Sequence, residues 1–487
     1  MRFGWILIAL ALALVACAHV SPKIDTSPPA RSLEEALAQL QRKADAIVAS
    51  HKAPSVAMGI VQGARLIWFR GFGHRDVEGQ MPLDENTAFR IGSITKTLTS
   101  VALLQLRDAG KLSLDDPLTK YVPEAAGVVN PGTEPIRLRN LVTHTSGLGR
   151  EVMPKEGPTQ EALLAALKGL PLEFEPGTSW SYSNYAMALA GLVVERASGE
   201  QYRLYMQRHV FDPLGMSSTA FDPAGLPPGS LAVGYEREGD GPYHPIAKQR
   251  DGGAMEPCGG VYSTVADLAK YAAFELGAWW NRGSEVLSAR SRIESQTPTA
   301  MPLSAGPIVG VNWFVSGSKI GRSIWHDGSI DGYRALLAFY PNRDMAVIVL
   351  IGGDEGGMAQ ELEFAAVDAL QSWVPALDAR PGPEMRVALK RLIDLIDRPD
   401  PSSEPSPDEL AAIFSEGFLS HSSKKESLGH FVGRVRSWLG QCPETGVALA
   451  GMSSFATVWY ACEKARAHMD VWLEPGTGLI SGWMAIP

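Results

Sequence analysis

Strand-like segments stand at the two ends of residues 33–376, and helix-like segments lie between them. Residues 55–76 contain two short strand patterns around a glycine-bearing turn, and residues 323–351 contain three. A helical pattern at 33–48, with Ser32 as its cap, precedes the first strands, and another at 357–373 follows the last. Such strands bury their apolar faces by pairing across the region. We therefore predict an α/β (α+β) fold in which both ends share one antiparallel sheet flanked by helices.

The composition changes after residue 376, where two stretches rich in proline, serine and charge enclose a helical pattern. Such stretches indicate a linker, which we place at 377–407. Residues 408–487 are globular in composition again, with a helix predicted at 410–419 and strand patterns at 454–462, 465–474 and 478–486. We expect a small α+β domain with an antiparallel meander there, and its sequence indicates no function.

The amino terminus has the features of an export signal. Arg2 precedes an apolar run that ends in the letters LVAC, with the cysteine at position 17. This ending resembles a bacterial lipobox, which predicts a lipoprotein-type signal peptide at 1–17 and a lipid on Cys17; simple cleavage after Ala18 is the alternative. Residues 18–32 would form a polar tether. The expected location is the periplasmic side of a bacterial membrane, anchored at Cys17, or the soluble periplasm under the alternative.

The remaining cysteines and the overall charge bear on disulfides, metals and partners. Export permits a disulfide between Cys442 and Cys462, and two free thiols are the alternative. Cys258 is expected to be a buried structural cysteine. The sequence contains no cysteine pair with zinc spacing and no His-Glu-x-x-His motif, so no metal or cofactor is predicted. A net charge of −9 without a basic run argues against nucleic-acid binding, and no protein partner is indicated.

The pattern Ser-x-x-Lys occurs three times, at 93–96, 316–319 and 422–425. The second lies in a glycine-serine turn and the third in a polar stretch, whereas Ser93 opens an apolar helical pattern. Residues three apart share a helix face, so the Lys96 amine can reach the Ser93 hydroxyl. Burial and the positive end of the helix both disfavour a charged amine, which suits a base that activates serine. The alternative is that Ser93 only caps the helix and Lys96 extends to water.

Two further stretches carry groups that can take part in such chemistry. In SYSN, Tyr182 and Asn184 are two apart and point the same way in extended chain, where a tyrosine can relay a proton and an amide can bind substrate. In HDGS, Gly328 lets substrate lie close to a strand, and the N–H of Ser329 could join that of Ser93 as an oxyanion hole. Ordinary turn residues are the alternative for both stretches.

Six stretches in this order resemble the successive motifs of the serine β-lactamase and penicillin-binding-protein superfamily, in its class C β-lactamase-like branch. They are FRIGSITK, LVTHTSGL, FEPGTSWSYSN, VFDPLGMSST, CGGVYSTVADLAKY and HDGSIDGYRA. The resemblance covers residues 33–373 and implies a sheet with a helical subdomain and an acyl-enzyme formed between them. By position, it implies that Ser93 is the nucleophile, Lys96 its base, Tyr182 a second general acid/base, and Asn184 a residue that positions Lys96 and the substrate.

The HDGS stretch departs from the commonest pattern of the superfamily. His326 falls where many members carry the lysine of Lys-Thr-Gly, Asp327 replaces the threonine, and Gly328 is kept. His-x-Gly also occurs in this superfamily, among esterases and D-amino-acid-specific peptidases. Histidine is mostly uncharged near neutral pH and Asp327 adds negative charge, so this motif is expected to bind a substrate carboxylate only weakly. His326, Gly328 and Ser329 are the predicted substrate-binding residues of this strand.

Two functions follow from these patterns. The first is an exported serine hydrolase that acts through an acyl-enzyme on Ser93, on a β-lactam, a D-amino-acid peptide of peptidoglycan or a small ester. The alternative is a catalytically weak protein that binds or senses cell-wall fragments and retains the fold. The set of Ser93, Lys96, Tyr182 and Asn184 favours the hydrolase, because a pure binding protein needs no buried base. The substituted His326 motivates the alternative.

Overall fold

The computed structural model describes fourteen stretches of the chain. These are residues 32–150, 158–239, 241–247, 249, 252–280, 282–298, 308–318, 320–371, 383–396, 406–414, 447–452, 455–461, 466–473 and 480–486. Cys17, Cys442 and Cys462 lie outside these residues, so the predicted lipidation and disulfide stay predictions. Within the described stretches, no helix combines the length and apolar character needed to cross a membrane.

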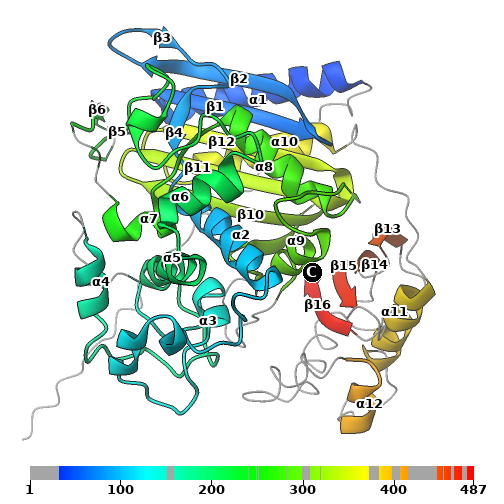
Figure 1. Ribbon diagram of the computed structural model, residues 1–487. Helices are drawn as coiled ribbons and strands as arrows, with labels where there is room; N and C mark the ends of the chain where they lie inside the picture. Colours follow the sequence, from blue (N-terminus) through cyan, green and yellow to red (C-terminus); the bar gives the residue numbers. More distant parts are fainter. Residues whose placement is uncertain are drawn as a thin grey trace, which may run out of the picture.

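An eight-stranded antiparallel sheet runs through the protein, in the order β3-β2-β1-β12-β11-β10-β9-β8 (Figure 1). β1 pairs with β12, from Ser55 opposite Gly352 to Gln62 opposite Met345. The predicted pairing of the two ends of the region is therefore confirmed. The strands are β1 Ser55–Gln62, β2 Arg65–Asp76, β3 Met81–Pro82, β8 Ile308–Val309, β9 Phe314–Ser318, β10 Gly321–Ile330, β11 Tyr333–Tyr340 and β12 Met345–Gly352. Two short pairs are separate from this sheet: β4 Ala88–Arg90 with β7 Tyr262–Thr264, and β5 Tyr235–Glu236 with β6 His244–Pro245.

Helices cover both faces of the sheet. Successive side chains of a strand point to opposite faces, and on β11 Leu336 joins the cluster under α1 (Leu33–His51) and α10 (Met358–Leu370), whereas Leu337 joins the cluster on the other face. That other face packs against α8 (Val265–Gly277). The N–H of Glu35 donates to Ser32 Oγ at 3.1 Å, so the predicted cap of α1 is confirmed. The sheet is thus buried between two apolar layers.

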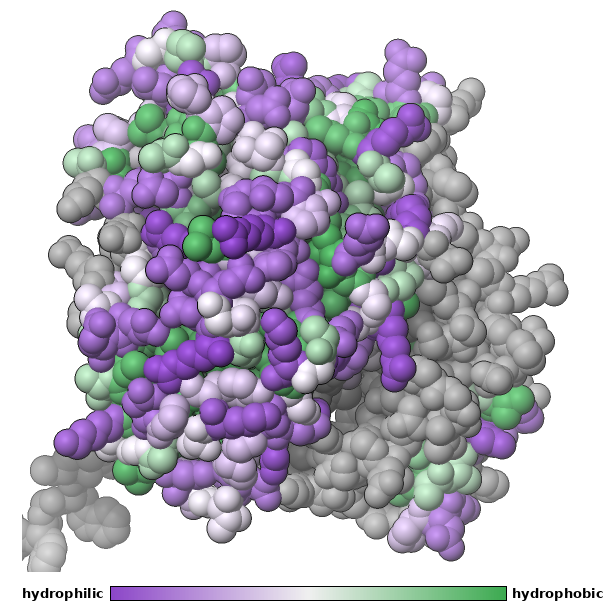
Figure 2. Space-filling view, in the orientation of Figure 1, coloured by the Kyte–Doolittle hydropathy of each residue, from purple (hydrophilic) through white to green (hydrophobic). Residues whose placement is uncertain are grey.

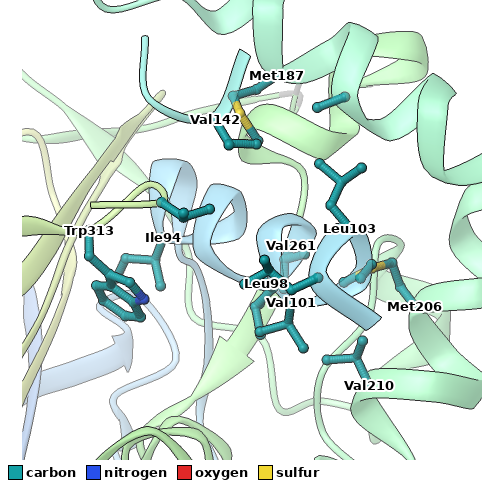
Figure 3. Close-up of a cluster of buried hydrophobic side chains, with 14 of the residues drawn as sticks. Ile94, Leu98, Val101, Leu103, Val142, Met187, Met206, Val210, Val261 and Trp313 are labelled. Atoms are coloured by element: carbon teal, nitrogen blue, oxygen red, sulfur yellow. The ribbon is translucent and has the colours of Figure 1, made fainter. Parts of the chain in front are cut away.

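The helix α2 (Thr95–Asp108) is buried on almost every side, including the polar residues of its first turns. Figure 3 shows its leucine and valine side chains among residues from other helices and from the sheet region. Those labelled are Ile94, Leu98, Val101 and Leu103 of this segment, and Val142, Met187, Met206, Val210, Val261 and Trp313 around it. Close packing on all sides fixes the start of α2, where the predicted nucleophile and base lie.

The segment between β4 and β8 is mostly helical and forms the predicted helical subdomain (Figure 1). Its longest helix in the lower half of the view, α5, ends at Gly199, whose φ of +79° is the left-handed conformation of a glycine stop. Besides α2 and α8, its helices are α3 Leu138–Val142, α4 Gln160–Ala165, α5 Asn184–Ser198, α6 Tyr202–Met206, α7 Glu256–Gly259 and α9 Ala289–Ser295. Single turns are η1 Gly92–Ile94, η2 Leu118–Lys120, η3 Pro123–Gly127, η4 Gln207–Phe211, η5 Pro223–Gly225, η6 Gly253–Met255 and η7 Pro341–Arg343.

The carboxyl-terminal part contains a second antiparallel sheet, in the order β13-β14-β15-β16. Three of its strands match the predicted meander, and β13 was not predicted. The predicted helix at 410–419 is wrong in its bounds: α12 begins earlier, because Ser406 forms a capping box with Glu409 ahead of Pro407, and it ends at Ala411. The elements are α11 Pro383–Ile396, α12 Pro407–Ala411, β13 Val447–Met452, β14 Phe455–Ala461, β15 Arg466–Leu473 and β16 Ile480–Ile486.

Candidate active site

Ser93 lies in a tight turn between β4 and α2. The sequence predicts a helix from Ser93, but residues Gly92–Ile94 form a 3-10 turn and α2 begins at Thr95. Gly92 has φ +50°, a conformation that favours glycine. This turn leaves the Ser93 side chain partly exposed although its neighbours on both sides are buried. A hydroxyl held in this way is open to a substrate and rigidly placed.

The HDGS stretch of β10 packs directly against this turn. A Cβ at Gly92 would lie 2.8 Å from the backbone N of Ser329, and a Cβ at Gly328 would lie 2.0 Å from the carbonyl O of Ile91. Only two residues without side chains permit such an approach of β10 to the Ser93 turn. The structure therefore brings Ser93, Gly328 and Ser329 together, with the N–H of Ser329 on the strand that borders the nucleophile.

Lys96 is fully buried on the first turn of α2. Its Nζ lies 2.9 Å from Ser93 Oγ and 2.6 Å from the carbonyl O of Cys258, and both contacts are hydrogen bonds in which the amine donates. Among the described residues, no carboxylate forms an ion pair with it. The predicted contact between the two side chains is present, and the alternative in which the lysine extends to water is wrong. Cys258 is half-buried rather than buried as predicted, and its carbonyl contributes to the site.

Tyr182 is positioned by the loop that leads into α5. The next residue, Ser183, caps the helix through a hydrogen bond from the N–H of Ala186 to its Oγ. The Tyr182 ring has its centroid 4.9 Å from Lys96 Nζ and 5.0 Å from the guanidinium carbon of Arg150. The structure thus brings Tyr182 to the Ser93–Lys96 pair, as predicted from the SYSN stretch.

Asn184 is the first residue of α5, and its N–H donates to the carbonyl O of Arg150 at 3.0 Å. The expected hydrogen bond between the Asn184 side chain and Lys96 is not among the contacts of the described residues, where Lys96 donates to Cys258 instead. Asn184 is the first residue after the Ser183 cap, so its backbone is fixed by the start of α5. Its role toward a substrate stays a prediction.

His144 belongs to the site, although no functional role was predicted for it from the LVTHTSGL stretch. It follows α3 with φ +59°, and its Nδ1 accepts the N–H of Ser183 at 3.2 Å. Its ring lies 4.4 Å from the ring of Tyr182, centroid to centroid. Burial, together with the nearby charges of Lys96 and Arg150 and the imidazole of His326, holds the pKa of His144 well below 6.5. A neutral, buried imidazole therefore orients the loop that carries Tyr182.

His326 is the buried residue of β10 that stands beside Tyr182, with 6.4 Å between their ring centroids. Its Nδ1 lies 2.6 Å from the carbonyl O of Asp327, and its Nε2 has no hydrogen-bond partner among the described residues. Burial lowers the pKa of His326 to about 4, and Lys96 adds to this lowering, whereas Asp327 opposes it. The expectation of an uncharged histidine at this position is consistent with that direction.

The structure describes only a part of the other two Ser-x-x-Lys patterns. Ser316 is in β9, where its Oγ accepts a hydrogen bond from Trp325 Nε1 at 3.1 Å, and residues 319 and 422–425 are outside the described residues. Among the described residues, no cluster of three histidine, cysteine or carboxylate side chains could hold a metal ion. The site therefore offers a hydroxyl, a buried amine, a phenol and a strand-edge N–H, which are the components of acyl transfer to serine.

Comparisons with known proteins agree with this arrangement. The Beta-lactamase family model matches residues 40–372. The D-alanyl-D-alanine-carboxypeptidase/endopeptidase AmpH of Escherichia coli (strain K12) is 27% identical over 359 residues, which is 70% of this chain and 91% of AmpH. Protein flp of Staphylococcus aureus (strain MW2) is 25% identical over 304 residues, or 61% of this chain. That match spans only 59% of the length of flp.

Two solved structures share the fold. One is a class C beta lactamase from Rhodobacter sphaeroides, with a TM-score of 0.60 and 22% identity over 68% of this chain and 99% of that one. The other is an octameric penicillin-binding protein homologue from Pyrococcus abyssi, with a TM-score of 0.61 and 21% identity over 90% of this chain and 96% of that one. At these identities the likeness concerns the fold, and it confirms the predicted fold class.

Proposed function

The chain belongs to the beta-lactamase family, and from that premise we propose that it is a serine hydrolase that forms an acyl-enzyme on Ser93 and hydrolyses an amide or an ester. One observation carries the proposal: the buried Lys96 amine lies 2.9 Å from Ser93 Oγ and has no carboxylate partner among the described residues. A structural lysine in a core is normally paired with an acid, because an unpaired buried charge is strongly unfavourable. In its neutral form, an amine at this distance can accept the hydroxyl proton.

The proposed reaction follows from the positions of these groups. Ser93 Oγ attacks the substrate carbonyl while Lys96 accepts its proton, and the N–H groups of Ser93 and Ser329 stabilise the negative charge on the carbonyl oxygen. The leaving amine or alcohol then takes a proton from Tyr182, whose ring lies beside Lys96. Water attacks the acyl-enzyme in a second step, with Tyr182 as the group that accepts the proton of water. The bond between Ser93 Oγ and the acyl carbon then breaks, and Lys96 returns its proton to Oγ as the acid leaves.

A labelling experiment tests this proposal. We expect a fluorophosphonate probe to add its mass to the intact wild-type protein and to leave Ser93→Ala unlabelled. Ser316→Ala is the matched control, because Ser316 also stands three residues before a lysine but lies in β9, away from this site. Lys96→Met should fold, since it replaces a buried amine by an apolar chain of similar length, and should label at least about 100-fold more slowly. Equal labelling of Ser93→Ala and wild type would refute the assignment.

The relatives support the substrate range rather than a single substrate. AmpH is named as a D-alanyl-D-alanine carboxypeptidase and endopeptidase, and the structural neighbours are a beta lactamase and a penicillin-binding protein homologue. We extend the proposal to peptidoglycan-derived peptides, β-lactams and small esters. Slow acylation without turnover, together with saturable binding of muropeptides, would instead favour the alternative of a protein that senses cell-wall fragments.

The same proposal places the hydrolase on the periplasmic side of a bacterial membrane, with its lipid on Cys17. Support comes from the sequence of the amino terminus, which lies outside the described residues. Cys17→Ser should move the protein from the membrane fraction to the soluble fraction without changing its labelling by the probe. Retention of the variant in the membrane fraction would contradict the lipid anchor.

A further inference from the structure

In the proposed reaction Tyr182 protonates the leaving group, and His326 of β10 stands beside Tyr182 with 6.4 Å between their ring centroids, so the charge that β10 presents bears on the choice of leaving group. His326 and Asp327 are the residues of β10 beside the Ser93 turn, ahead of Gly328. A carbonyl oxygen only accepts hydrogen bonds, so the 2.6 Å contact with the carbonyl O of Asp327 puts the proton of the neutral imidazole on Nδ1. The other nitrogen, Nε2, then carries a lone pair.

This arrangement is unsuited to a substrate carboxylate. A lone pair on Nε2 repels a carboxylate oxygen, and binding one there would require a proton on a ring that is about 99% buried. Burial lowers the pKa of His326 below that of a free imidazole, so the ring is neutral at pH 7. Nε2 is also buried without a partner among the described residues, which leaves it able to accept a hydrogen bond.

The exposed charge next to His326 is negative. The Asp327 side chain is 47% exposed, and its Oδ1 lies 4.0 Å from His326 Nδ1. Among the described residues, Arg150 lies on the Tyr182 side of the site, and Arg334 of β11 is opposite Ser329, with its Nη1 bonded to the carbonyl O of Tyr333. The residues of β10 nearest the nucleophile, His326 to Ser329, therefore add no fixed positive charge there.

We propose that this site selects substrates whose leaving group is an uncharged hydrogen-bond donor or a cation, such as a carboxamide, an internal peptide or an ammonium, over substrates whose leaving group carries a carboxylate. The inference rests on the proposed acyl transfer at Ser93 and names the substrate class of that site. Each of the three features points the same way: the neutral ring of His326, the lone pair on its Nε2 and the half-exposed carboxylate of Asp327.

Three matched thioesters test the selection. Benzoylglycine is joined to mercaptoacetate, to mercaptoacetamide or to thiocholine, so that the acyl group is constant and the leaving thiols differ mainly in charge; the quaternary nitrogen of thiocholine cannot attack its own thioester. Thiol release gives kcat/KM for each probe with the full-length protein. We expect the amide and ammonium probes to exceed the carboxylate probe by about ten-fold or more, as two like charges near a protein surface would produce. Equal rates, or a preference for the carboxylate, would overturn the inference.

Two variants of β10 locate the cause. His326→Lys should shift the ratio of carboxylate to amide rates by about ten-fold or more toward the carboxylate. Asp327→Asn, a conservative change at a half-exposed position, should shift the same ratio in the same direction and does not depend on the buried lysine being accommodated. Gln371→Lys, at the exposed end of α10 on the other face of the sheet, adds one positive charge elsewhere and should leave the ratio unchanged. An unchanged ratio in Asp327→Asn would contradict the role of β10.

The inference and the proposed function fail in different ways. Loss of fluorophosphonate labelling in wild type would refute acyl transfer at Ser93, and the relative affinities of the three probes, measured by calorimetry, would still test the charge selection. Normal labelling with a carboxylate preference that disappears in Arg150→Gln would keep the hydrolase and overturn the inference, because recognition would then come from the Tyr182 side rather than from β10.

Discussion

Glu275 of α8 is a buried carboxyl group whose ionisation should control the pH dependence of stability. It is 1% exposed, and the amide of Gln296 donates to its Oε2 at 2.5 Å. Burial raises the pKa of Glu275 from 4.5 to about 7, although Arg292, Gln296 and Tyr271 each oppose the rise. The carboxyl is therefore protonated in the folded protein over a pH range in which it is ionised in the unfolded chain.

The sign and size of the effect follow from linkage. Because the folded-state pKa is raised, the contribution of Glu275 to stability is fully present below pH 4.5 and is lost as the pH rises to about 7. A difference of roughly 2.5 pKa units corresponds to about 3 kcal/mol in the free energy of unfolding. Glu275→Gln keeps an acceptor oxygen for Gln296 and removes the titration. The variant should therefore be more stable than wild type at pH 8, and this difference in the free energy of unfolding should be about 3 kcal/mol smaller at pH 4.5.

Urea unfolding of wild type and variant at pH values from 4.5 to 8 measures this difference. Comparing the two proteins cancels every other titrating group, including Glu363, whose pKa is also raised by burial. Glu236→Gln, at an exposed position of β5, is the control and should parallel wild type at each pH. A difference between Glu275→Gln and wild type that stays constant across the range would refute the reasoning, because it would show that Glu275 titrates alike in both states.

Two further substitutions test the geometry of the site. Gly328→Ala should reduce fluorophosphonate labelling by at least about 100-fold, because its Cβ would lie 2.0 Å from the carbonyl O of Ile91 and separate β10 from the Ser93 turn; Gly356→Ala, with no atom within 4 Å of its Cβ, should label as wild type. His144→Ala should destabilise the fold by about 2 kcal/mol in urea unfolding and slow labelling, because it leaves the buried N–H that precedes α5 without its acceptor. His144→Asn, which tolerates positive φ and offers an acceptor oxygen, should recover part of both losses, and no recovery would contradict the positioning role.

Much of the fold could be predicted because its elements are marked by local patterns. The strands at 55–76 and 323–351 and the cap at Ser32 are signalled by residues within a few positions of each other, and their order allows few sheet topologies. The strand β13 escaped prediction because VALAGM is rich in alanine and glycine and has little strand preference of its own. Its place beside β14 is set by the neighbouring strand rather than by its sequence.

In the candidate site, likewise, one contact could be predicted from local sequence and others could not. The contact between Ser93 and Lys96 could be predicted, because residues three apart on a helical turn always lie on one face. The acceptor that holds the amine from the other side is the Cys258 carbonyl, 162 residues further along the chain, and its side chain gives no signal of that role. His144 likewise acts through a hydrogen bond to Ser183, 39 residues away.

By itself, the sequence determined which groups are present, their spacing along each element and the order in which those elements enter the sheet. Only the tertiary structure decided which of those groups are enclosed and which neighbours they meet. Lys96 and His326 are shielded from water by segments that are distant in sequence, and the free energy of a buried charge depends on that enclosure and on the partners that packing supplies. Residue types are fixed along the chain, whereas desolvation is a property of the assembled layers around it.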